Sequence, residues 1–411
     1  MKTFRLVIIV LTLSEVISCN NMKDKVESGN NSSLIQIKIE KPNITSLKPL
    51  LLSEFADRID YVQLETSDSC IMPPNINTHL TNDFIFTTFG SKIFQFDHIG
   101  KFIRQIGREG QGPGEFKLAN FGVDDINRKI FVVSYSNQCP LIFDYDGKYL
   151  GNITDSLICS CFGGVEHFGV SDGYFIHTIH PTDIDLQWAG KPYELIVYDY
   201  NNKKVTQTLT NKLSVKVDDT KHFNSLNPSL QSLTKCDSLY YYQSFYNDTL
   251  YAVNNSNIRP FAIIDFGKNK FPTDFLHSPD INKLKESASG KMRIIGFYMN
   301  KDFVFLFVSL HNVGAFLCKY EIATKSTSYH SGSIINDIDG WQNVNLHAIE
   351  KRISIVRHPN DYDDKQFKEG AFSKLNKAEL KNPEQKEKIE KLMQKNREKE
   401  DNPVIMILTL K

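Results

Sequence analysis

Residues 93–103 read IFQFDHIGKFI, and their pattern gives the strongest indication of the fold class. Apolar residues alternate with other residues on both sides of a short polar segment, which predicts two strands joined by a tight turn. We expect Asp97 to cap the turn, Gly100 to take a positive φ, and Lys101 to lead into the exit strand.

The same unit recurs along the chain. Residues 141–150, LIFDYDGKYL, repeat it, and their turn glycine, Gly147, lies 47 residues after Gly100. A looser copy, LIVYDYNNK, occupies residues 195–203, where we expect an asparagine to take the place of the glycine. Repeats of roughly 40–50 residues built from short strands are typical of β-propeller blades. The sequence therefore predicts a mainly β protein of the propeller class.

Further strands continue the pattern toward the C-terminus. One sheet is predicted from residues 239–242, 246–251 and 261–266, another from 294–298, 303–308 and 315–320, and a weaker set over 331–357. These segments give about six blades between residues 55 and 411. A ring of blades must close to hide its edge strands. We expect the apolar run Val404–Leu410 to close the ring beside the early strand 59–65.

The sharpest local motif is GREGQGPGEF at residues 107–116. A phosphate-binding loop would need a following Lys-Ser/Thr pair, and Pro113 lacks the backbone amide that such a loop uses. We therefore predict a structural inter-blade loop, with Phe116 as an apolar plug between the first blades. The loop residues are Gly107, Gly110, Gly112, Pro113, Gly114 and Phe116, and we expect positive φ among the last three glycines.

The N-terminal residues have the pattern of a secretory signal. Lys2 and Arg5 precede an apolar run at residues 6–13, which is too short to span a bilayer but is typical of a secretory signal. The next residues, Val16-Ile17-Ser18-Cys19, resemble a bacterial lipobox. That resemblance implies cleavage before Cys19 and lipidation of Cys19; a plain secretory signal is the alternative.

These features predict the domain organisation. We expect a signal peptide at residues 1–18, a flexible polar tether at 19–33, and a propeller at 34–411 with a charged helical insertion at 365–401 before the closing strand. The protein would then be lipid-anchored in the cell envelope, with the outer membrane as the expected membrane, facing the periplasm or the surface.

The whole chain resembles the bacterial six-bladed β-propeller lipoprotein family, which is NHL-repeat-like. The resemblance rests on the lipobox, the block at residues 246–251, the closing strand after Asn402-Pro403, and the 107–116 loop, which matches the NHL pattern G-x-x-G-x-G-P-G-x-F. It covers residues 35–411 and implies an all-β propeller of six four-stranded blades.

Composition narrows the function. The chain has 411 residues with 48 basic and 48 acidic side chains, so it lacks the positive charge of a general nucleic-acid binder. Besides Cys19 there are six cysteines, which could form three disulfides or none, and we expect buried free thiols. Cys159 and Cys161 form a C-x-C pair that cannot easily close on itself, and we identify no second Cys or His pair that would complete a zinc site with it.

Residues 365–401 are rich in lysine and glutamate and predict a helix that starts at Asn382-Pro383. A narrow apolar stripe of Ile389, Leu392 and Met393 runs along it. We expect this stripe to pack on the protein's own propeller; the alternative is a docking helix for a partner protein.

Candidate catalytic groups are few. His177 and His180, with Asp183 and Asp185 nearby, are a possible metal site, but strand residues three apart face opposite sides. The turn aspartates, exemplified by Asp97, belong to separate blades and should not converge as paired carboxylates must.

We therefore favour a non-catalytic binding or scaffolding propeller for a protein or glycan ligand, with no cofactor, no metal and no nucleic acid. The alternative is an NHL-like metal-dependent lyase or hydrolase with its site in the central channel. That reading requires three histidines from different blades to meet at one point. The candidates are His98, His167, His177, His222, His311 and His347.

Overall fold

The hairpin expected at residues 93–103 is present in the computed structural model, where β6 (Lys92–Asp97) turns into β7 (Phe102–Ile106). Asp97 Oδ1 accepts the backbone N–H groups of Ile99 at 3.0 Å and Lys101 at 2.8 Å. Gly100 has a φ of 87°. A carboxylate cap and a left-handed glycine therefore make this turn, as predicted.

The two later copies of the turn differ from each other. Between β10 (Leu141–Asp144) and β11 (Tyr149–Asn152), Asp144 caps Lys148 N at 2.8 Å and Gly147 has a φ of 83°. Between β14 (Tyr193–Asp199) and β15 (Lys204–Thr210), the left-handed residue is Lys203, with a φ of 52°. The expectation of a left-handed asparagine there is wrong: Asp199 pairs with Lys204, five residues on, whereas Asp97 bonds to Lys101, four residues on, so the left-handed position moves from the third to the fourth residue after the aspartate.

The structure describes residues 34–73, 76–117, 119–134, 136–160, 168–179, 193–210, 232–243, 247–272, 286–345, 352–361, 365, 370–399 and 401–411. The described residues belong to one unit, Leu34–Lys411. The expected signal peptide, the tether and Cys19 lie outside them.

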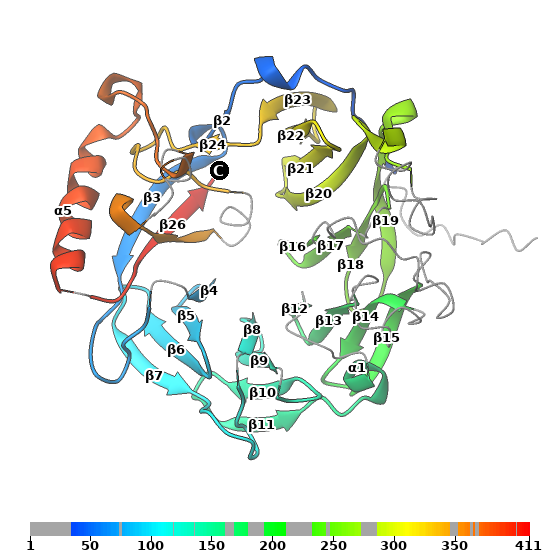
Figure 1. Cartoon of the computed structure of the whole chain (residues 1–411). Helices are drawn as coiled ribbons and strands as arrows, with labels where there is room; N and C mark the ends of the chain where they lie inside the picture. Colours follow the sequence, from blue (N-terminus) through cyan, green and yellow to red (C-terminus); the bar gives the residue numbers. More distant parts are fainter. Residues whose placement is uncertain are drawn as a thin grey trace, which may run out of the picture. The chain divides into compact units, whose positions relative to one another are not determined.

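Within the described residues the strands form six sheets of three to five strands and one short two-stranded sheet. Figure 1 shows these sheets following one another around a ring, which is the architecture of a six-bladed β-propeller. The first three blades contain, besides the strands already named, β4 (Asn77–Leu80), β5 (Phe84–Phe89), β8 (Ala119–Asp124), β9 (Lys129–Ser134), β12 (Phe168–Ser171) and β13 (Tyr174–Thr178).

The next two blades follow the predicted strand segments closely. The fourth is built from β16 (Ser232–Cys236), β17 (Leu239–Gln243), β18 (Thr249–Val253) and β19 (Ile258–Asp265). The fifth is built from β20 (Met292–Met299), β21 (Phe303–Leu310), β22 (Gly314–Glu321) and β23 (Ser326–Ser331). The early strand β1 (Ile35–Lys38) adds to the fourth blade in parallel with β19, a long-range pairing that alternation alone does not specify.

The sixth blade closes the ring as predicted. Its described strands are β25 (Ile353–Val356), β26 (Val404–Leu410) and β3 (Ala56–Gln63), with β26 in the middle. C-terminal β26 pairs antiparallel with N-terminal β3, with Ile405 opposite Val62 and Leu408 opposite Ile59. Figure 1 shows this pair as a red and a blue strand side by side.

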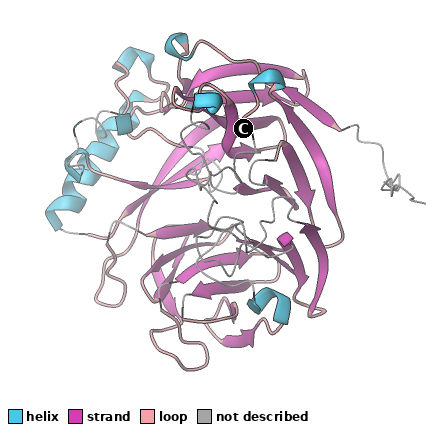
Figure 2. Ribbon diagram, turned by 45° about the vertical axis from the view of Figure 1, so that its right-hand side comes forward, coloured by secondary structure: helices cyan, strands magenta, loops and turns pink. Residues whose placement is uncertain are grey.

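Helices are a minor component. Figure 2 shows strands making up most of the described structure, with the longest helix, α5 (Pro383–Lys399), outside them. Other helical segments among the described residues include α1 (Ser156–Ser160) and 3₁₀ turns at Ile44–Ser46, Leu52–Glu54, Gly267–Asn269, Pro359–Asp361 and Lys377–Glu379. A short pair of β2 (Leu50–Leu51) and β24 (Ile334–Ile335) completes the strands. No helix among the described residues has the length and apolarity needed to span a membrane.

The structure corrects the expectation that the cysteines after Cys19 are free thiols. Cys139 and Cys159 form a disulfide with their Cα atoms 4.8 Å apart, so the free-thiol prediction is wrong for these two. Cys139 precedes β10, and Cys159 lies in α1 just after β11, so folding of the second blade brings them together. Cys70 and Cys318 are buried free thiols, and Cys236 is a half-buried one. Cys161 lies outside the described residues.

Candidate functional site

The 107–116 loop connects the first blade to the second, and Phe116 anchors it. Phe116 is fully buried in an apolar cluster shared by Phe86 and Ile106 of the first blade and Phe143 of the second. Gly107 and Gly114 have φ values of 70° and 76°, whereas Gly110 and Gly112 are not among the left-handed glycines. The burial and the two left-handed positions are what an inter-blade connection requires.

Glu115 occupies the position that a phosphate would need. Its carboxylate accepts the backbone N–H of Gly112 at 2.8 Å and pairs with Arg108 Nε at 2.7 Å. The Gly112 hydrogen bond and then the Arg108 guanidinium lower the pKa of Glu115. A charged carboxylate that already uses the loop's amide would repel a phosphate, so this geometry disfavours anion binding.

The turn aspartates do not form a catalytic pair. Asp97, Asp144 and Asp199 each end a strand in a different blade and each accept backbone N–H groups of their own turn. Each carboxylate caps its own turn, as the sequence predicts.

The histidine hypotheses fall partly outside the described residues. His177 is fully buried in β13, but its candidate partners His180, Asp183 and Asp185 are not described. Of the proposed channel histidines, His98 lies in the exposed β6–β7 turn, and His311 packs against Phe271 with ring centroids 5.3 Å apart. The other three, His167, His222 and His347, lie outside the described residues. In the part of the chain that is described, no three His, Cys, Asp or Glu side chains gather as a metal site requires.

The described residues do contain an open polar groove between α5 and the sixth blade, with a volume of about 600 Å³. We call it the α5 groove, and it is lined by Trp341, His358, Glu390, Lys391, Gln394, Lys395 and Glu398. The helix is fixed beneath it by Ile389 and Met393, which are buried in the core that the sixth blade shares with its neighbours. The apolar stripe of α5 is therefore covered by the protein's own propeller.

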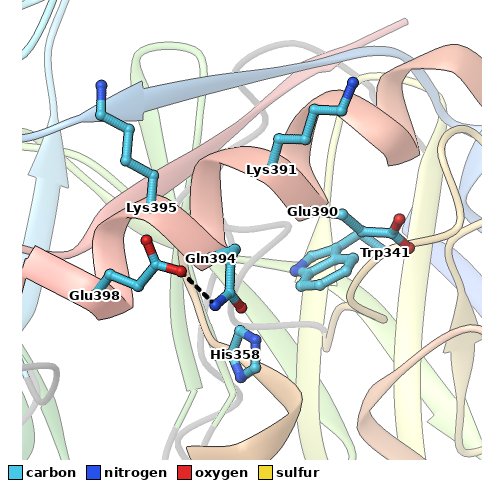
Figure 3. A pocket seen from close by; sticks show the side chains of 7 residues that line it. All are labelled: Trp341, His358, Glu390, Lys391, Gln394, Lys395 and Glu398. Atoms are coloured by element: carbon cyan, nitrogen blue, oxygen red, sulfur yellow. Dashed lines mark hydrogen bonds between the residues drawn. The ribbon is translucent and has the colours of Figure 1, made fainter.

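The side chains of α5 divide into two rows along the groove. Glu390, Gln394 and Glu398 are spaced four residues apart, so they share one face of the helix. Figure 3 shows this row extending toward Trp341 and His358, while Lys391 and Lys395 extend away from them on the outer side. Gln394 Nε2 donates to Glu398 at 2.8 Å, which orders the row.

Trp341 forms the floor of the groove and carries an unusual donor. The residue is only 6% exposed, and its indole N–H meets no acceptor among the described residues. A buried donor without a partner costs about 1–3 kcal/mol. Its backbone is held on both sides, because its N–H donates to Asp339 Oδ1 and its carbonyl accepts from Ser373 N, each at 3.0 Å. The backbone of the floor residue is thus held in place, while its indole N–H has no acceptor in the described part of the chain.

His358 lines the same groove and is held by its neighbours. Its Nδ1 accepts the backbone N–H of Asn360 at 3.2 Å and lies 2.9 Å from a guanidinium nitrogen of Arg397. Two donors directed at Nδ1 favour the tautomer that carries its proton on Nε2. The sequence singled out neither Trp341 nor His358, because the groove joins segments that are distant along the chain and no local pattern marks them.

Comparison with known proteins gives a family and a fold. A family model described as a domain of unknown function (DUF4934) matches residues 34–409. No curated protein matches the sequence. The structure of a Bacteroides fragilis protein, described as a candidate exported protein, is similar with a TM-score of 0.56 at 17% identity, covering 92% of this chain and 100% of that one.

Two further structures are more distant. A DUF4221 family member from Bacteroides vulgatus has a TM-score of 0.40 at 11% identity, covering 69% of this chain and 90% of its own. Virginiamycin B lyase from Staphylococcus aureus has a TM-score of 0.35 at 11% identity, covering 67% and 74%. Likeness at this level carries no argument about activity, so the lyase does not make this chain a lyase.

Proposed function

The chain belongs to the family described as a domain of unknown function (DUF4934), and from that premise we propose that it is an envelope lipoprotein whose propeller binds a protein or glycan ligand without catalysis. The α5 groove carries the proposal. It is a preformed polar surface in which the indole N–H of Trp341 has no acceptor within the part of the chain that the structure describes. The scaffold beneath it is closed by the pairing of β26 with β3 in the sixth blade.

Two observations support an extracytoplasmic location. The Cys139–Cys159 disulfide is of a kind that persists in oxidising compartments and is rare in the cytosol. The B. fragilis protein with a similar fold is described as a candidate exported protein, which agrees with that location. The anchor itself rests on the sequence pattern ending at Cys19.

Fractionation tests the anchor. The Cys19→Ala variant should move from the membrane fraction to the soluble fraction, because no acyl chain can then attach. A Cys236→Ala variant serves as the matched cysteine control and should stay with the membrane. An unchanged distribution of Cys19→Ala would sink the lipoprotein proposal.

Capture of the ligand tests the binding function. A tagged full-length chain should retain a protein or a glycan from solubilised envelopes, and a Glu390→Lys substitution in the groove should abolish retention. Lys388→Glu, an exposed charge reversal on the same helix that lies outside the groove lining, is the control. Retention that is indifferent to Glu390→Lys would place any binding surface elsewhere.

A further inference from the structure

The charges of the α5 groove select against ions. Glu390 and Glu398 place two negative charges along it, and Lys391 and Lys395 place two positive charges beside them. The charges of the two glutamates and the two lysines sum to zero, so an anionic or a cationic ligand would meet like charges as well as opposite ones. A neutral ligand avoids the repulsion of both rows.

The hydrogen-bonding groups of the groove call for a ligand that both donates and accepts. The carboxylates of Glu390 and Glu398 accept only, the Gln394 amide does both, and the Trp341 indole donates only. A hydroxyl group supplies one donor and accepting lone pairs, so adjacent hydroxyls can satisfy carboxylate and indole together. An apolar ligand would leave the indole N–H of the floor unpaired.

Access to the indole depends on one side chain. Figure 3 shows the indole nitrogen facing Gln394, whose amide lies across the groove from it. Gln394 is exposed, and its hydrogen bond to Glu398 is exposed as well, so water can replace that bond and the side chain can turn aside at little cost. A ligand oxygen that replaces it reaches the unpartnered donor.

We propose that the α5 groove is a binding site for a neutral saccharide, held by hydroxyl hydrogen bonds to Glu390 and Glu398 and by the indole N–H of Trp341. This inference rests on the proposed binding function and names its ligand class. A groove of about 600 Å³ has room for a short oligosaccharide.

Calorimetric titration of the full-length protein tests the assignment. The neutral probes are maltotriose, cellotriose, mannotriose and chitotriose, and the charged probes are trigalacturonic acid and a trilysine peptide. At least one neutral probe should bind and both charged probes should not. Trp341→Phe removes the N–H but keeps an aromatic ring, and should weaken binding about fivefold to tenfold.

A surface variant guards against a folding artefact of the buried tryptophan. Glu390→Gln lies on an exposed helix position and should weaken the same probe by a similar factor, whereas Lys388→Ala should leave its affinity unchanged. Neutral binding that survives both Trp341→Phe and Glu390→Gln overturns the site. Absence of neutral binding overturns the saccharide assignment, and if envelope capture still depends on Glu390, the binding function stands without it.

Discussion

Single buried residues join neighbouring blades, and Asp124 is the clearest case. It is fully buried at the end of β8 in the second blade. Its carboxylate accepts the backbone N–H of Gly173 at 2.9 Å and the hydroxyl of Tyr200 at 2.5 Å, both from the third blade. Asp199 makes a similar link to Asn255 of the next blade at 3.1 Å. Turn-end aspartates thus fasten blades together as well as capping turns.

The pKa of Asp124 predicts an acid-sensitive contact. Burial by itself raises that pKa, but the hydrogen bonds from Gly173, Tyr200 and Asn127 outweigh it and hold the pKa below its usual range. A lowered native pKa stabilises the fold above the unfolded value near ~3.9, and this contribution disappears as pH falls through the native pKa.

Asp124→Asn should therefore cost about 1.5–3 kcal/mol near pH 7, because a hydrogen-bonded buried charge is lost. The gap in melting temperature between wild type and variant should narrow below about pH 4, because Asp124 of the unfolded chain becomes protonated there while the folded carboxylate is still charged. Thermal melts of both proteins from pH 7 to pH 3 measure this difference in melting temperature. A gap that stays constant across that range would falsify the linkage.

Two glycines of the inter-blade loop should differ in how much stability the protein loses when each is replaced by alanine. Gly114 has a φ of 76°, and an added Cβ would lie 2.9 Å from the Tyr149 ring. Gly112 is not left-handed, and an added Cβ would lie 3.1 Å from a terminal oxygen of Glu115. Gly114→Ala should destabilise the protein by roughly 1 kcal/mol or more, and Gly112→Ala by less.

Chemical denaturation of both variants gives the comparison, with added ATP as a second arm. ATP should not raise the stability of any form, because Glu115 already uses the loop's amide. Stabilisation of the wild type by ATP that is lost in Gly112→Ala would revive the phosphate-loop alternative.

Among the elements, α5 is a charged helix stabilised by few apolar contacts. The ion pair between Glu387 of the helix and Lys377 before it is 2.6 Å long but exposed on both sides, so water screens it and it stabilises the helix little. Burial of Ile389 and Met393 contributes about 1.5–3 kcal/mol for each side chain. The helix is therefore held by its apolar stripe, and its polar side remains available for the groove.

The Cys139–Cys159 disulfide cross-links two segments of the second blade. Cys139 and Cys159 are 20 residues apart in sequence, and a cross-link of that span stabilises a fold by about 3 kcal/mol. Reducing agent should lower the melting temperature of the wild type. It should have no effect on a Cys139→Ala/Cys159→Ala double variant, whereas Cys236→Ala should keep the wild-type response. Equal sensitivity of the double variant and the wild type would rule out this bond as the source.

At the scale of the whole molecule, ring closure depends on residues from both ends of the chain. Asn402, which precedes β26, is 1% exposed. Its side chain donates to the carbonyls of Glu65 at 2.6 Å and Cys70 at 2.7 Å and accepts from Met72 N at 2.8 Å. It thus ties the C-terminal strand to the segment that follows β3.

Deletion of residues 403–411 should strongly lower the melting temperature, because β3 and β25 would both lose their central partner and expose edges. Asn402→Ala should have a smaller effect, since it removes the tie but leaves β26 paired. Differential scanning calorimetry on the two variants shows which one lowers the melting temperature more. A native melting temperature in the deletion variant would contradict the closed ring.

Much of this architecture was predictable from local sequence. Alternation and the Asp-x-x-Gly turns specify strands and hairpins, because each depends on residues within a few positions of one another. The repeat spacing then indicates blades, and the apolar run Val404–Leu410 indicates a strand that needs covering on both faces. The start of α5 at Pro383 likewise follows from Asn382-Pro383, which is local capping chemistry.

Which distant segments meet could not be predicted locally and is known from the three-dimensional fold. The place of β1 on the fourth blade, the choice of Cys139 and Cys159 among six cysteines, and the α5 groove with Trp341 at its floor all join positions far apart along the chain or left open by local pattern. Strand alternation says which face is buried but not against what, and a lone tryptophan or cysteine carries no signal of its partner. Folding of the second blade sets the disulfide, whereas the place of β1 and the α5 groove depend on how the blades pack when the ring closes and brings distant segments together.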